Sequence, residues 1–300
     1  MTSLSARIQW GVIAALVALD AAGLFHCGIH LAWQGLIRVV GAMLIFTALG
    51  LFYERWRPDE RLSDLAWSGV RLLAFFAAMG VMSYLVAATD LPLVDDRLAA
   101  ADRALGLDWL GWFAFVQHHR VFHGFLHAAY LTALPQIAII TTYLGLAGRP
   151  ERNSEFLWLM IVSTAIIVPL SGLLPAFNAS VYFGVPGFVE HMPDFVALRT
   201  GRFTELDLSR LQGLVSFPSF HTSLGVLFPY VLRGRRIPLL IALRVNGALI
   251  AAVPTEGGHY FVDVLAGAAV AVVAMVATAA IEARLAGRQA SARLAAADAD

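Results

Sequence analysis

Apolar residues occur along this chain in blocks about 20 residues long, separated by short polar or arginine-rich segments. A helix needs about 20 such residues to cross the hydrocarbon core of a bilayer. Eight blocks approach this length, and the pattern therefore predicts eight membrane-spanning helices. They cover about residues 8–27, 33–53, 64–89, 123–147, 154–175, 217–232, 236–254 and 259–283.

Composition agrees with this pattern. The chain has 300 residues, of which 59% are hydrophobic, and its mean hydropathy is +0.72. These values exclude an ordinary soluble domain and predict an all-α, polytopic transmembrane helical bundle. The formal net charge is zero, which gives no sign of a nucleic-acid partner. The single cysteine, Cys27, excludes an internal disulfide and a cysteine-rich metal site.

The arginines predict the orientation of the bundle. The chain has no lysine, and twelve arginines lie close to span ends on one side, against six in longer segments on the other. Because short cytoplasmic loops carry the excess of positive charge, we expect both termini in the cytoplasm. We also expect an ion pair between Asp20 and Arg38, which fall at similar depth in the first two spans.

Two longer segments are expected on the extracytoplasmic side. Residues 90–122 are rich in Trp and Phe near their end, which is typical of a helix lying in the membrane interface. Residues 176–216, which include Pro186 and Gly187, lead into the chemistry described next, and we expect them to cover it. The division expected is 1–63 for two added spans, 64–284 for a six-span core, and 285–300 for a frayed cytoplasmic tail.

Two short motifs indicate the chemistry: FPSFH at residues 217–221 and HYFVD at residues 259–263. His259 follows His221 by 38 positions, enough for the chain to cross the membrane and return. Both histidines are therefore expected at the same, extracytoplasmic face. Asp263 follows His259 by one helical turn, so the two side chains share a helix face.

These residue types suit phosphoryl transfer. Pro218 fits the first turn of a helix, whose free N–H groups favour an anion, and Ser219 adds a donor. Asp263 can fix the tautomer of His259 and leave its other nitrogen as a nucleophile, while His221 can move a proton. Two histidines and a carboxylate can also bind a metal ion, and three polar residues can merely pack a bundle, so both alternatives stay open.

The motifs resemble the second and third signatures of the type 2 phosphatidic acid phosphatase superfamily. Their context, from Val215 to Thr222 and from Gly258 to Gly267, is similar to the branch that includes the inositol phosphorylceramide synthases and many bacterial relatives. The resemblance implies a membrane-embedded lipid phosphatase or phosphotransferase without metal or cofactor, in a bacterial inner or plasma membrane. His259 would attack phosphorus, Asp263 would orient it, His221 would protonate the leaving oxygen, and Ser219 would contact phosphate.

The implied partners are a lipid phosphate or phospholipid and, for a transferase, a small alcohol acceptor such as inositol. A transporter or scaffold on the same fold is the alternative of another class. The first superfamily motif needs a lysine, which this chain lacks, and Ala252 and Val253 replace the usual Ser-Arg before the third motif. Because the phosphoryl charge must still be balanced, we expect Arg199 and Arg202 to bind phosphate.

Further polar residues lie near the predicted site. His119, His123 and His127 recur every four residues, which fits an interfacial polar face or a metal stripe. His127 and Tyr130 are candidates for lining a head-group pocket. Glu256 could polarise an acceptor hydroxyl, but we favour its being a cap of the last helix.

Overall fold

The computed structural model describes residues 4–185 and 192–297, so Pro186 and Gly187 of the expected covering loop lie outside the described residues. The elements in chain order are α1 (Leu4–Cys27), β1 (His30–Leu31), α2 (Trp33–Arg55), α3 (Glu60–Ala87), α4 (Asp95–Ala104), α5 (Trp109–His118), α6 (Arg120–Leu131), α7 (Ala133–Leu146), α8 (Pro150–Leu173), α9 (Ala179–Tyr182), α10 (Met192–Arg199), β2 (Glu205–Leu206), α11 (Phe220–Val231), α12 (Arg236–Glu256) and α13 (Phe261–Ala297).

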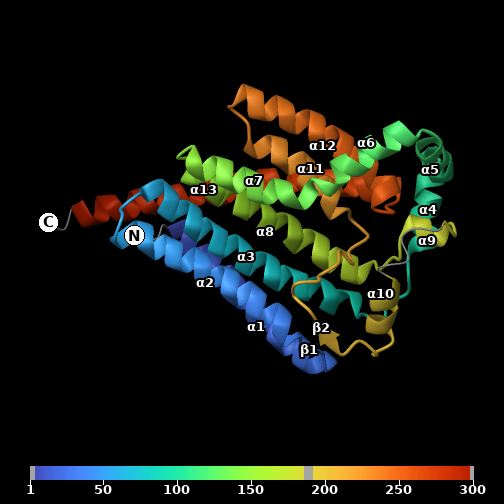
Figure 1. The fold of residues 1–300 in the computed structure, drawn as a ribbon, viewed down its shortest axis with the longest axis horizontal. Helices are drawn as coiled ribbons and strands as arrows, with labels where there is room; N and C mark the ends of the chain where they lie inside the picture. Colours follow the sequence, from blue (N-terminus) through green and yellow to red (C-terminus); the bar gives the residue numbers. More distant parts are fainter. Residues whose placement is uncertain (1–3, 186–191, 298–300) are drawn as a thin grey trace.

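The predicted polytopic helical bundle is confirmed. In the described part of the chain, α1, α2, α3, α8, α12 and α13 are each long and apolar enough to cross a membrane. The protein is therefore an integral membrane protein. Both termini lie at one end of the bundle, whereas α4, α5, α9, α10 and the β strands gather at the other (Figure 1).

The predicted span at 123–147 is broken. It consists of α6 and α7, which meet at Thr132 with a bend of 50°. Pro135 lies in the first turn of α7, where it lacks the N–H that would continue the hydrogen-bond ladder of α6. The span predicted at 217–232 is α11, which has only 12 residues and is about 18 Å long. It is thus shorter than the roughly 30 Å of a full crossing.

The two N-terminal helices are much less buried than α8. The apolar stretch of α8 is 67% buried, against 17% for α1 and 11% for α2. In a membrane protein, exposed apolar helix faces contact lipid, so α1 and α2 lie at the periphery. At the end near the termini, α1 joins α8 through polar contacts: Ser5 Oγ lies 2.9 Å from Ser154 Oγ and accepts a hydrogen bond from Trp158 Nε1.

The N-terminal helical hairpin anchors the loop that precedes the FPSFH motif. β1 pairs in parallel with β2, and His30 N–H donates to Thr204 O. Arg38 Nη1 donates to Ser209 Oγ at 2.9 Å. The predicted ion pair between Asp20 and Arg38 is therefore wrong, because the arginine reaches the loop instead. This two-stranded pairing was not predicted, since two-residue strands carry no periodic signal.

The C-terminal end also differs from expectation. Helix α13 continues to Ala297, through residues expected to form a frayed tail. Alanine has the highest helix propensity, which explains why this alanine-rich sequence continues as a helix. The segment at 90–122 is helical as predicted, but it contains α4, α5 and the first residues of α6, and a turn at Gly106 with φ of +73° separates α4 from α5.

Candidate active site

A cavity of about 480 Å³ lies where α11 and α13 begin. Its lining is largely apolar, and its polar members include Tyr130, Asn178, Ser216, His221, Glu256 and His259. Both motif histidines therefore line one cavity, as their spacing predicted. A second cavity of about 1180 Å³ is lined by residues such as Glu54, Arg71 and Arg233, and by none of the predicted site residues.

His259 lies in the short connection between α12 and α13, and Asp263 lies in the first turn of α13. His259 Nδ1 is 3.2 Å from Asp263 Oδ2, which also accepts the Tyr260 N–H at 2.9 Å. Asp263 is fully buried. With Nδ1 directed at the carboxylate, Nε2 is left as the lone-pair nitrogen.

The electrostatic environment keeps His259 neutral. Burial lowers its pKa from 6.5 to about 4, although the backbone of Ser216, which favours the protonated ring, acts in the opposite direction. A buried imidazole loses solvation when it is charged, which is the physical cause of the lowering. At neutral pH the ring is therefore uncharged and can act as a nucleophile.

The first motif surrounds the start of α11. Ser219 is the N-cap residue of this helix, and its Oγ accepts the N–H of Thr222 at 3.3 Å. The Ser219 N–H donates to Asp263 O at 3.1 Å, which ties the two motifs together through the backbone. Pro218 precedes the N-cap, so its predicted place in the first turn is wrong. Ser219 is fully buried, and its hydroxyl caps the helix.

His221 lies in the first turn of α11 and faces the cavity. The ring of Tyr130 stacks on it, with centroids 4.7 Å apart and planes inclined by 24°. Tyr130 lines the same cavity, as expected, whereas His127 contacts it only through Glu256. A broken span thus delivers an aromatic ring to the histidine of another helix.

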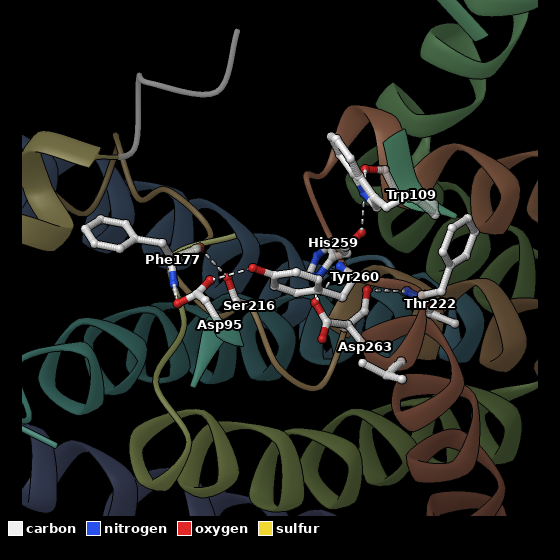
Figure 2. Close-up of polar contacts among 12 residues, drawn as sticks. Asp95, Trp109, Phe177, Ser216, Thr222, His259, Tyr260 and Asp263 are labelled. Carbon is white, nitrogen blue, oxygen red and sulfur yellow. Dashed lines mark hydrogen bonds and ion pairs between the residues drawn. The ribbon is translucent and has the colours of Figure 1, made fainter. Parts of the chain in front are cut away.

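Two aspartates of α4 support the second motif, and Figure 2 shows one of them, Asp95, beside Tyr260. Asp95 accepts the Tyr260 hydroxyl at 2.9 Å and the Phe177 N–H at 3.0 Å. Asp102 accepts the N–H groups of Phe261 and Val262 at 2.9 and 2.8 Å. Burial raises the pKa of each carboxyl, and these donors oppose the rise. Both side chains were missed by the sequence analysis.

Trp109 completes this support from α5. Its Nε1 donates to His259 O at 3.0 Å and lies 3.2 Å from Pro254 O, so the indole joins the end of α12 to the start of the motif. Its ring stacks on those of Phe113 and Phe183, with ring centroids 5.1 and 5.4 Å apart. The segment that was expected to lie in the membrane interface therefore contacts the backbone of His259.

The predicted phosphate-binding arginines lie apart from the histidines. Arg199 donates to Thr89 O at 2.8 Å and to Leu91 O at 2.6 Å. Arg202 Nε donates to Thr200 Oγ1 at 3.0 Å and is exposed. Within residues 4–185 and 192–297, no arginine lines the cavity. The phosphate-binding role of both arginines stays a prediction.

Glu256 differs from its favoured interpretation as a cap. It is the last residue of α12, and its carboxylate contacts His123 Nε2 at 3.0 Å and His127 Nδ1 at 2.6 Å. The N–H groups of α13 are bound instead by Asp102. His119 bonds Phe115 O. Among the described residues, no group of three or more His, Cys, Asp or Glu is arranged to hold a metal ion.

Comparison with known families identifies the fold that carries this site. The family model of the PAP2 superfamily matches residues 96–277, from α4 into α13, and so includes both motifs and the supporting aspartate Asp102. Searches of curated proteins and of solved structures gave no match. The match covers more than half of the chain and supports a phosphatase-type lipid enzyme fold. The chain therefore belongs to the PAP2 superfamily.

Proposed function

We propose that this protein is a lipid phosphatase or phosphotransferase that acts through a phosphohistidine at His259. The observation that carries the proposal is that His221 and an Asp263-oriented His259 line one apolar cavity inside a membrane protein. An apolar cavity with a few convergent polar groups suits a lipid whose phosphate reaches the histidines. Superfamily membership agrees with a lipid substrate.

The reaction has two displacements. In the first, His259 Nε2 attacks phosphorus, the bond to the leaving oxygen breaks, and His221 gives that oxygen a proton. In the second, water or an alcohol attacks phosphorus and the phosphorus–nitrogen bond breaks. Water makes the protein a phosphatase, and an alcohol such as inositol makes it a phosphotransferase. The motif context shared with the inositol phosphorylceramide synthase branch supports the second possibility.

The position of the site at the extracytoplasmic face is also part of this proposal. The arginine distribution supports it, as does the location of both termini at the end opposite α4 and α5. Arg199 and Arg202 stay the predicted phosphate donors. If Arg202 binds phosphate, Arg202→Ala lowers turnover by about 10- to 1000-fold with no change in thermal stability, the range for one lost oxyanion donor.

The test is incubation of the purified protein with a panel of radiolabelled lipid phosphates and phospholipids, with and without inositol. Free phosphate and new lipids are both scored, and His259→Ala is the matched control. Product formed by the wild type and not by this variant supports the enzyme. A folded wild-type protein that converts no member of the panel would favour the transporter or scaffold on the same fold.

A further inference from the structure

Glu256 is a carboxylate in a place where a phosphoryl group is expected. It lines the same cavity as His221 and His259, and only 9% of its side chain is exposed. A negative charge there would repel an anionic substrate unless hydrogen-bond donors compensate it. The Glu256 carboxylate is therefore electrostatically unfavourable for binding a phosphate, and the packing of the cavity does not explain why an acidic residue lies there.

Two histidines meet this carboxylate from the outer side. His123 Nε2 lies 3.0 Å from Oε1, and His127 Nδ1 lies 2.6 Å from Oε2. The two histidines are one turn apart on α6, so they present one face to the end of α12. Each carboxylate oxygen keeps a second lone pair that can accept a hydrogen bond from another donor.

Exposure increases from the cavity outward. The side chain of Glu256 is 9% exposed, that of His123 is 33% exposed, and that of His127 is 54% exposed. A chain of hydrogen-bonded ionisable groups can carry a proton between a buried cavity and the surface of a protein.

We propose that Glu256 is the base that takes the proton of the acceptor hydroxyl, and that His123 and His127 carry this proton to the aqueous surface. The proposal rests on the proposed function and concerns its second half. The acceptor oxygen bonds to phosphorus while the phosphorus–nitrogen bond breaks. The electron pair returns to His259 Nε2, and the acceptor proton moves to a Glu256 oxygen. His221 regains from solvent the proton that it gave to the leaving group.

The two halves of the reaction separate this role from a structural one. We would use [³²P]phosphatidic acid in mixed micelles and compare Glu256→Gln with the wild type and with Glu205→Gln, an exposed acid in β2. Glu256→Gln should lower turnover by about 10²- to 10⁴-fold, the usual contribution of a general base. Acid-trapped label on His259 should increase by about 10-fold or more, because the phosphoenzyme forms but is not discharged. Glu205→Gln should match the wild type.

A second measurement uses hydroxylamine, a neutral nucleophile that is reactive without a base. Added before the acid quench, it should discharge the phosphoenzyme that accumulates in Glu256→Gln. The double variant with His123→Gln and His127→Gln should accumulate label as well. If turnover and label fall together in Glu256→Gln, or if neither changes, the proposal is overturned while the proposed function stands. If wild-type protein gives neither product nor label with any lipid of the panel used to test the proposed function, both are overturned.

Discussion

The carboxylate of Asp102 accepts the backbone N–H of Phe261 at 2.9 Å, which joins α4 to the first turn of α13 across 159 positions of sequence. The same carboxylate accepts the N–H of Val262 at 2.8 Å. These are N–H groups that a helix leaves without intrahelical partners, and an acidic side chain there is favourable. Asp102 therefore caps the start of α13 from another helix. This start lies two residues after His259.

Asp102→Asn tests this cap. An amide can accept through its oxygen only, so one of the two N–H groups faces a donor, and the loss of a buried hydrogen bond costs about 1–3 kcal/mol. We expect a lower Tm and a lower turnover, because the start of α13 also carries Asp263. Asp90→Asn, at an exposed position before α4, is the control. An unchanged Tm in Asp102→Asn would contradict the role of a cap.

Close approach of two helices is required at Gly267. A Cβ atom at this position would lie 2.3 Å from Ser219 O, a backbone atom that cannot rotate away. Gly267→Ala should therefore push α13 from the start of α11, at a cost of about 1–3 kcal/mol for overpacking. We expect reduced turnover and a reduced Tm in a thermal unfolding measurement.

Gly247→Ala is the matched control for this substitution, since nothing lies within 4 Å of its added Cβ in α12. Alanine is favoured over glycine in a helix by up to about 1 kcal/mol, so this variant should be as stable as the wild type or more stable. Equal behaviour of the two variants would show that the contact between Gly267 and Ser219 does not limit stability.

The sequence predicts the parts of this site that depend on local spacing. One helical turn separates His259 from Asp263, and their hydrogen bond forms as expected. The helices α11 and α12 separate His221 from His259, and both histidines line one cavity, as the spacing predicted. The partners of Glu256 were not predicted, because contacts across 129 or more positions depend on how α6 packs against α12. Asp95 and Asp102 share one face of α4 at a spacing of seven, a signal that was available but resembles any solvated acidic face.

The pH dependence should reflect the lowered pKa of His259. Only the neutral ring can attack phosphorus, and a pKa of about 4 keeps it neutral down to that pH. The acid limb of kcat/KM, which reports groups of the free enzyme, should therefore fall near pH 4 instead of near 6.5. A pH–rate profile between pH 3.5 and 8 measures this. An acid limb centred near 6.5 would mean that His259 is not desolvated as the structure indicates.

Substitutions at the three motif residues test the double displacement. His221→Ala, His259→Ala and Asp263→Asn should each lower turnover by about 100-fold or more, because each group acts on the bonds that form or break. Acid trapping should give label on His259 in the wild type and none in His259→Ala. Half of the wild-type turnover remaining in His259→Ala would remove the nucleophile assignment.

The native cysteine can test the orientation of the bundle. Cys27 is exposed at the end of α1, beside β1 and thus at the end of the bundle away from both termini. If this end is extracytoplasmic, a membrane-impermeant maleimide added to intact cells should label the wild type. Cys27→Ser should remove this label, and Thr204→Cys in that background should restore it, because Thr204 accepts a hydrogen bond from His30 in the same region. Gly234→Cys, in the turn between α11 and α12, should label only after the cells are opened. The opposite pattern would place the histidines and their lipid phosphate at the cytoplasmic face.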